Sequence, residues 1–303
     1  MTLIVGTEAG LHELDESSGP IGVHLAGHAA DCLAPEGSGW WVLTDGEDLW
    51  RSDRRGAWDR AATSSGPRLN CVCSTAVGLL VGAEEASLLR LEEGKLQPLG
   101  AFGDVPGRDG WYTPWGGPPD VRSMSEDPRR AVFVNVHVGG IVRSTDGGDT
   151  FQPTIDIDTD VHQVLAPAGR PGLVLAATGA EGLAVSSDGG ETWSFVTEGL
   201  HASYSRAVTV GETTLLASAS TGPRGGRAAV YRRPLSDDGP FVKCADGLPD
   251  WFAANIDTFC LAASGALAAF GTDEGSVFLS EDEGETWRLL AEGLSAVRCL
   301  AFA

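Results

Sequence analysis

The sequence predicts an all-β protein, a seven-bladed β-propeller with four-stranded blades, formed by residues 1–303 as a single domain. Three observations predict this fold. An eight-residue turn motif occurs three times. Short polar-to-apolar runs recur at intervals from 39 residues (31 to 70) to 52 residues (70 to 122), close to the ~40–50 residues of a four-stranded propeller repeat. The N-terminal segment also contains strand-like runs for only three strands of a blade, and the C-terminal segment contains one further strand.

The turn motif has the form Ser-x-Asp-x-Gly-x-Thr-Trp/Phe and occupies residues 144–151, 186–193 and 280–287, with weaker copies at 52–58 and 236–241. An Asp carboxylate can accept hydrogen bonds from turn N–H groups, Gly can take a positive φ, and Ser and Thr hydroxyls can bind the remaining backbone groups. The motif resembles the Asp-box of BNR-repeat propellers, a sialidase-like family akin to the WD40 and YVTN propellers. The resemblance implies that the turn joins the third and fourth strands of a blade and is structural.

Two columns of short segments align between the motifs. The first column begins with a polar residue and predicts first strands at 31–33, 70–72, 122–124, 162–164, 206–208, 258–260 and 298–300. The second column is almost continuously apolar, as expected for strands covered on both faces. It predicts second strands at 3–6, 41–43, 79–81, 132–134, 174–176, 215–217 and 267–270.

The two ends of the chain complement each other. Residues 2–27 supply a second, third and fourth strand, and residues 297–303 supply a first strand. We therefore expect the N- and C-terminal strands to pair in one blade, which removes exposed sheet edges.

Two inserts account for the long intervals. The density of Gly, Pro and aromatic residues in residues 102–119, which include Trp111, Tyr112 and Trp115, predicts an ordered loop. The second insert includes residues 222–227 and the segment around Trp251.

A ligand site is expected where first strands begin and second strands end, since these positions share one face, opposite the Asp-box turns. The family resemblance implies that this face, at the mouth of the central channel, carries the site. Its candidate binding residues are Arg122, Arg206, Arg298, Asp31, Asn70, Glu84, Trp111, Tyr112, Trp115 and Trp251. Polar residues at a wet channel mouth are also expected without any function, and Arg and Asp residues there can simply pair with one another.

Adjacent blades should bring one group of candidates towards a single sector. His137 and His162 are candidate general acids or bases, with Asp160 and Tyr204 as further catalytic candidates. Arg122 and Arg206 are candidates for binding an anion. Two arginines beside two imidazoles favour an anionic or carbonyl-bearing ligand over a bare metal ion.

Composition limits the partners. The chain has 42 acidic and 21 basic residues and a formal net charge of −21, which disfavours nucleic acid and membrane surfaces. The N-terminal segment, residues 1–10, has no basic region and no apolar run of signal-peptide length, so a cytoplasmic location is expected. The six cysteines lack zinc-ribbon spacing and are expected to be free and mostly buried.

The sequence therefore favours a propeller that binds a small anionic or carbonyl-bearing molecule, or a glycan, and it leaves a protein partner open. The alternative is a glycoside hydrolase, or a metal-dependent lyase or hydrolase using histidines and carboxylates of the same face. A sialidase is disfavoured, because the Phe/Tyr-Arg-Ile-Pro segment typical of those enzymes is absent. Enzymatic activity, cofactor and metal content stay undetermined: no cofactor is required by the sequence, and a metal at the channel mouth is allowed.

Overall fold

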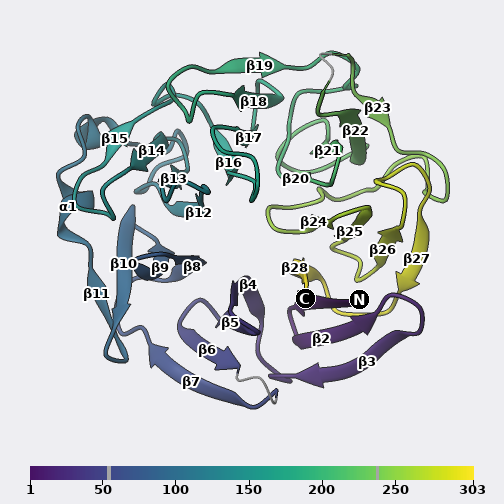
Figure 1. Cartoon of the computed structure of the whole chain (residues 1–303), viewed down its shortest axis with the longest axis horizontal. Coiled ribbons are helices and arrows are strands. Elements are labelled where there is room, and N and C mark those ends of the chain that lie inside the picture. Colours follow the sequence, from purple (N-terminus) through teal and green to yellow (C-terminus); the bar gives the residue numbers. More distant parts are fainter. Residues whose placement is uncertain (53–55, 237–238) are drawn as a thin grey trace. The chain divides into compact units, whose positions relative to one another are not determined.

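The computed structural model describes residues 1–52, 56–236 and 239–303. Its strands form seven four-stranded sheets, the blades of a seven-bladed β-propeller, as predicted (Figure 1). The chain packs as two compact units: unit 1 comprises Met1–Ala30, Ala177–Ala184 and Phe195–Ala303, and unit 2 comprises Asp31–Ala176 and Val185–Ser194.

Three blades lie almost entirely in unit 2. The first contains β4 (Ala30–Glu36), β5 (Gly39–Thr44), β6 (Asp48–Ser52) and β7 (Trp58–Thr63). The second contains β8 (Leu69–Thr75), β9 (Gly78–Ala83), β10 (Ser87–Glu92) and β11 (Lys95–Pro98). The third contains β12 (Val121–Glu126), β13 (Val132–Val136), β14 (Gly140–Ser144) and β15 (Gln152–Pro153). Between β11 and β12 stand α1 (Gly100–Gly103) and a 3₁₀ turn, Arg108–Gly110.

Three blades belong to unit 1, and a fourth has residues in both units. Unit 1 holds β20 (Val208–Val210), β21 (Thr214–Ala219), β22 (Ala229–Pro234) and β23 (Val242–Lys243). It also holds β24 (Leu261–Ser264), β25 (Leu267–Gly271), β26 (Val277–Ser280) and β27 (Arg288–Ala291). Its closing blade has the order β28 (Val297–Phe302), β1 (Thr2–Thr7), β2 (Gly10–Asp15) and β3 (Gly19–His24). The divided blade contains β16 (Val161–Leu165), β17 (Val174–Thr178), β18 (Leu183–Ser186) and β19 (Ser194–Val196).

The predicted pairing of the two chain ends is confirmed. β28 pairs antiparallel with β1, with Leu3 opposite Phe302 (Figure 1). The contact is tight at Gly6, where a Cβ atom would meet Cys299 Sγ at 2.5 Å and the backbone oxygen of Ala30 at 2.6 Å. Gly6 therefore lets the Cys299 side chain of β28 and the backbone of Ala30 lie close to β1.

The second-strand column is confirmed in all seven blades, and strands such as β13 and β17 are buried along their whole length. Two first strands begin later than predicted, because Arg206 and Thr258 lie in the loops before β20 and β24. The Ser218 hydroxyl accepts the N–H groups of Arg206 and Ala207 at 3.2 and 3.0 Å, which replaces regular pairing there. Phe259 has a φ of 65°, so the backbone leaves the extended conformation just before β24.

The three strong turn motifs join third to fourth strands and share one set of hydrogen bonds. In the turn at residues 186–193, Ser186 Oγ accepts the Gly190 N–H at 2.8 Å and donates to Asp188 Oδ1 at 2.8 Å. The other Asp188 oxygen accepts the Thr192 hydroxyl at 2.6 Å. Equivalent bonds form around Asp146 and Asp282. In the weaker copies, residues 53–55 and 237–238 lie outside the described residues.

The cysteines are free, and all but Cys73 are buried. Several thiols donate to a first strand of the adjoining blade: Cys71 Sγ donates to Val121 O at 3.7 Å, and Cys260 Sγ donates to Val297 O at 3.4 Å. Burial raises the pKa of the Cys32 thiol to about 12, so it stays protonated at neutral pH. Among the described residues, no helix is long and apolar enough to cross a membrane.

Candidate functional site

Two neighbouring first strands of unit 2 bring four of the predicted residues together. Arg122 lies on β12, His162 lies on β16, Asp160 directly precedes β16, and His137 directly follows β13. The Ser123 hydroxyl on β12 accepts the N–H of Val164 on β16 at 2.9 Å, which fixes the two first strands side by side. We call Arg122, His137, Asp160 and His162 the histidine cluster.

Short contacts join the members of this cluster. His137 Nε2 lies 3.0 Å from Asp160 Oδ1 and 3.2 Å from Arg122 Nη1. His162 Nε2 lies 3.5 Å from the same Asp160 oxygen, and the two imidazole rings are 5.6 Å apart. His162 is 1% exposed, whereas Arg122, His137 and Asp160 are partly exposed. His162 is therefore the buried residue of the cluster, and the other three residues are accessible to solvent.

The backbone is strained at the residue that follows His137. The His137 N–H donates to the Asp120 carbonyl oxygen at 2.8 Å, which ties the turn to the start of β12. The next residue, Val138, is buried and has a φ of 53°. A β-branched residue rarely adopts this left-handed conformation, and such strain is concentrated at functional positions.

The aromatic insert reaches the cluster through Trp115. Its indole lies 5.2 Å from the His137 ring and is 65% exposed. Earlier in the insert, the Phe102 and Trp111 ring centroids are 5.7 Å apart, and the Arg108 guanidinium lies 4.9 Å from the Trp111 ring. Tyr112 is half exposed. The loop thus packs on its own aromatic residues and presents one indole beside the polar cluster.

Two carboxyls near these strands have opposite pKa shifts. Burial would raise the pKa of Asp160, but its contact with His137 and the charges of His162, His137 and Arg122 lower it below its ordinary value. Burial and the charge of Glu84 raise the pKa of Asp120, against the opposing charges of His137 and Arg122. Asp160 is therefore the anionic member of the cluster, and Asp120 is the carboxyl that gains a proton more easily.

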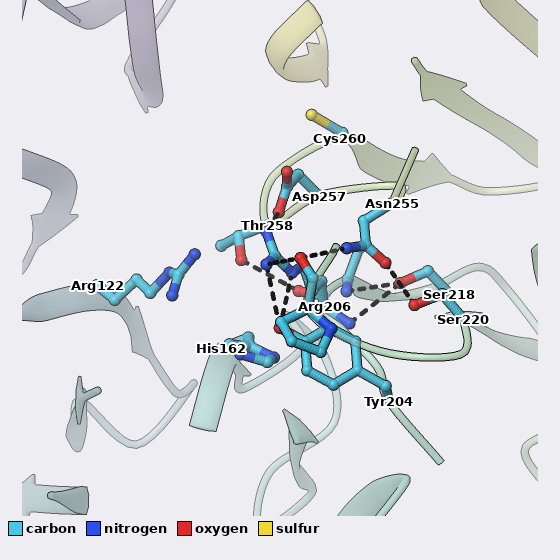
Figure 2. A network of polar contacts seen from close by, with 12 residues as sticks. Arg122, His162, Tyr204, Arg206, Ser218, Ser220, Asn255, Asp257, Thr258 and Cys260 are labelled. Atoms are coloured by element: carbon cyan, nitrogen blue, oxygen red, sulfur yellow. Dashed lines mark hydrogen bonds and ion pairs between the residues drawn. The ribbon is translucent and has the colours of Figure 1, made fainter. Parts of the chain in front are cut away.

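The other predicted pair, Tyr204 and Arg206, belongs to unit 1. Arg206 Nε and Nη2 donate to the Tyr204 hydroxyl at 3.2 and 3.0 Å, and Nη1 lies 2.5 Å from Asp257 Oδ1 (Figure 2). Nη2 also donates to the Pro223 carbonyl oxygen at 3.1 Å, and Asn255 Nδ2 donates to that oxygen at 3.2 Å. Burial would lower the pKa of Arg206, but the Asp257 carboxylate raises it. Arg206 thus anchors the second insert.

The remaining predicted residues have other neighbours. Arg298 forms an ion pair with Glu8. Asp31 accepts the Gly46 N–H at 2.8 Å and lies 3.5 Å from Arg68 Nη2.

Asn70 is partly buried, and the N–H of Glu84 donates to the Arg68 carbonyl oxygen at 2.8 Å. Trp251 lies 4.6 Å from His201 and is covered by Arg227 and Lys243, at 4.4 and 3.9 Å from its ring.

Sequence reasoning did not identify Asp120, Asp257 or Arg68. Asp120 and Asp160 each stand two residues before a member of the polar column, Arg122 and His162 respectively. This repeated spacing is a signal that could have identified Asp120. His137, Asp160 and His162 are also the described residues whose ligand atoms, all within 4.8 Å of one another, could hold a metal ion.

Comparison with known proteins supports the fold. The sequence matches no protein-family model and no curated protein, so the Asp-box resemblance stays a prediction. Among solved structures, it is similar to a GH74 enzyme of Niastella koreensis, with a TM-score of 0.64 and 13% identity over 94% of this chain and 46% of that one. It is also similar to the GH74 xyloglucanase of Xanthomonas campestris (TM-score 0.60, 15% identity, 95% and 46% coverage).

A third similar structure is U3-55K, with a TM-score of 0.62 and 16% identity over 92% of this chain and 87% of that one. The chain spans less than half the length of the two GH74 enzymes. At these identities the likeness defines the class of protein, a β-propeller.

Proposed function

We propose that this propeller binds a small molecule with an anionic or carbonyl group, including an acidic sugar, at the histidine cluster. One observation carries the proposal: a guanidinium, two imidazoles and a carboxylate converge within 3.5 Å contacts next to an exposed indole. A few convergent polar groups beside an aromatic surface are typical of a ligand site.

Each member of the cluster has a distinct role in the proposal. Arg122 would bind the carboxylate or carbonyl oxygen through charge-assisted hydrogen bonds. Asp160 holds His137 through the 3.0 Å contact and offsets part of the positive charge of Arg122. Trp115 would cover an apolar or sugar face of the ligand. The overall charge of −21 repels anions at a distance, so binding has to come from these local contacts.

The choice of a sugar acid as the first probe follows from two considerations. The Arg122 guanidinium calls for an anionic group, and the similarity to a xyloglucanase supports a carbohydrate. Glucuronate combines both properties, and glucose is its neutral counterpart. Pyruvate tests a small molecule that has a carboxylate and a carbonyl group without the sugar ring.

Calorimetric titration of the full chain tests the proposal. We expect glucuronate or pyruvate to bind more tightly than glucose, and Arg122→Gln to weaken this binding about 10- to 100-fold, as for a lost hydrogen bond to a charged group. Arg90→Gln removes the same charge at the Glu92 ion pair on β10 and serves as the matched control. Equal binding by the Arg122→Gln variant, or no binding of either anion, would overturn the proposal.

A second candidate function, glycoside hydrolysis, is favoured by the opposite pKa shifts of Asp120 and Asp160. Glycosidases use one carboxyl with a raised pKa as the acid and an ionised one as the base or nucleophile. We expect Asp120→Asn and Asp160→Asn each to slow hydrolysis of a 4-nitrophenyl glucuronide by about 10²- to 10⁴-fold. Absence of any hydrolysis by the unaltered chain would exclude this candidate and leave the binding proposal intact.

A further inference from the structure

We propose that His137, Asp160 and His162 form a binding site for one divalent transition-metal ion of the Zn²⁺ type. The inference deepens the proposed function and rests on it, because the bound metal would supply a contact point for the anionic or carbonyl oxygen of the ligand. The three side chains come from one compact unit and from two adjoining blades.

The spacing of the three ligand atoms matches a metal coordination shell. Metal–ligand bonds of about 2.1 Å place adjacent ligand atoms about 3.0 Å apart in octahedral geometry and about 3.4 Å apart in tetrahedral geometry. Asp160 Oδ1 lies 3.0 Å from His137 Nε2 and 3.5 Å from His162 Nε2. The cluster thus has two edges of such a polyhedron before any metal binds.

The donor set indicates the kind of metal. Two imidazole nitrogens and one carboxylate oxygen suit Zn²⁺, Fe²⁺ and similar ions, whereas Mg²⁺ and Ca²⁺ prefer oxygen ligands alone. A three-residue set leaves open coordination positions for water or a ligand oxygen. The acidic chain, with 42 carboxylates against 21 basic side chains, favours cation entry.

The hydrogen-bonding positions of His137 and Asp160 also favour a bound cation. Asp160 Oδ1 is buried, and two imidazole nitrogens lie within 3.5 Å of it. His137 Nε2 faces both a donor, Arg122 Nη1, and an acceptor, Asp160 Oδ1. One nitrogen can satisfy only one of them, since it either carries a proton or offers a lone pair. A metal ion between Nε2 and Oδ1 uses both lone pairs.

Arg122 then takes a different partner. Its Nη1 atom, now 3.2 Å from His137 Nε2, moves away from the metal-bound nitrogen and donates to the anionic ligand that the metal also contacts. The metal and Arg122 thus bind the same ligand from two sides. In the absence of that ligand, the guanidinium repels the ion.

The experiment is Co²⁺ and Zn²⁺ titration of the full chain after chelator treatment and dialysis. We expect one ion per chain, seen by calorimetry, and weak visible Co²⁺ absorption without thiolate charge-transfer bands, because the cysteines are not part of the site. His162→Gln and Asp160→Asn, which keep side-chain size, should each weaken binding by at least about tenfold. His24→Gln is the matched control, since His24 also lies beside a carboxylate, 3.2 Å from Glu13. Circular dichroism checks that each variant is folded.

The Arg122→Gln variant separates this inference from the proposed function. It should bind Co²⁺ at least as tightly as the unaltered chain, while it loses affinity for glucuronate. If no ion binds, or if the His24→Gln loss equals the His162→Gln loss, the metal inference is wrong, and anion binding by Arg122 stands on its own titration. If Co²⁺ binds in a His162-dependent manner and neither anion binds, the metal inference survives and the proposed function fails.

Discussion

The two ends of a blade hold their charged groups by different means. At the end with the turns between third and fourth strands, Asp188 is bound by hydroxyl and N–H groups within four residues along the chain. At the other end, where Val121 pairs with Val136, the contacts join residues far apart: Arg122 and His137, or His137 and Asp160. The Asp188 carboxylate thus has its hydrogen-bond partners within its own turn. At the other end, Arg122 and Asp160 both contact the same His137 nitrogen, and polar groups that compete in this way are available to a ligand.

The pKa shifts show the same contrast. Hydrogen bonds from Thr150 and Thr192 lower the pKa of Asp146 and Asp188 to about 2, so these carboxylates stabilise the fold as anions. Burial and a neighbouring carboxylate raise the pKa of Asp120 instead. The raised pKa means that Asp120 is destabilised as an anion. Perturbed pKa values of this kind are common at functional sites.

Removal of residues 297–303 is the largest perturbation, because it deletes one of the four strands of the closing blade. β28 contributes the buried residues Val297, Cys299 and Leu300 and pairs with β1. We expect the truncated chain to lose more than about 5 kcal/mol, enough to unfold or aggregate. A chain that ends at Phe302 is the control. A monomeric truncated chain with an unchanged melting temperature would contradict the closure.

Ser186→Ala tests the end with the turns between third and fourth strands. The buried Gly190 N–H would lose its partner, so we expect a loss of about 1–3 kcal/mol in denaturant unfolding. Ser187→Ala, at the adjacent exposed position, should change stability by less than about 0.5 kcal/mol. Glucuronate affinity of the folded variant should stay unchanged. A stable Ser186→Ala variant that selectively loses ligand binding would place the site at the wrong end of the blade.

Asp188→Asn tests whether the carboxylate charge stabilises the turn, through the pH dependence of stability. The folded-state pKa is about 2, below the ordinary value of 3.8, so the stabilisation is present above pH 3.8 and is lost as the pH falls towards 2. The variant should therefore melt at a lower temperature than the unaltered chain at pH 7, and the gap should close on acidification. Melting curves at pH 7, 4 and 2.5 measure this. A gap independent of pH would show that the carboxylate is not what the turn binds.

These variants lie in parts of the fold that the sequence predicts, and each of those predictions has a physical reason. The Ser-x-Asp-x-Gly-x-Thr turn needs only residues within an eight-residue segment, so its hydrogen bonds follow from spacing. The second strands are apolar on both faces, so their composition predicts them. The late starts of β20 and β24 could not be predicted, because they depend on the Ser218 hydroxyl and on the φ of Phe259.

The site was readable only in part. The alternation of first and second strands brought Arg122, His137 and His162 to one end of two blades, as the sequence predicted. The role of Asp120 depends on how deeply its carboxyl is buried and on the charge of Glu84, and no pattern in the sequence reports either. Likewise, Arg206 looked like an anion receptor, but its bonds to Tyr204, Asp257 and Pro223 are tertiary contacts.

Asp120→Asn should give the smallest effect, with the opposite sign to Asp188→Asn. The folded-state pKa of Asp120 lies above 3.8, so ionisation costs stability as the pH rises through that range. The variant should be slightly more stable than the unaltered chain at pH 7, by less than about 1 kcal/mol for a partly exposed charge. The difference should vanish below pH 3.8. A destabilised variant at pH 7 would mean that the Asp120 anion is needed by the fold.

The proposed function requires the ligand to bind at the first-strand end of unit 2, at the histidine cluster. Its most direct test is nitrogen-resolved NMR of the histidine rings in ¹⁵N-histidine-labelled protein during glucuronate and pyruvate addition. The chain has six histidines, so each ring can be assigned by single substitution. We predict that the signals of His137 and His162 shift and saturate, while those of His12 and His24 stay fixed. Shifts confined to histidines outside the cluster, or no shifts at saturating anion, would show that the ligand does not bind at the cluster.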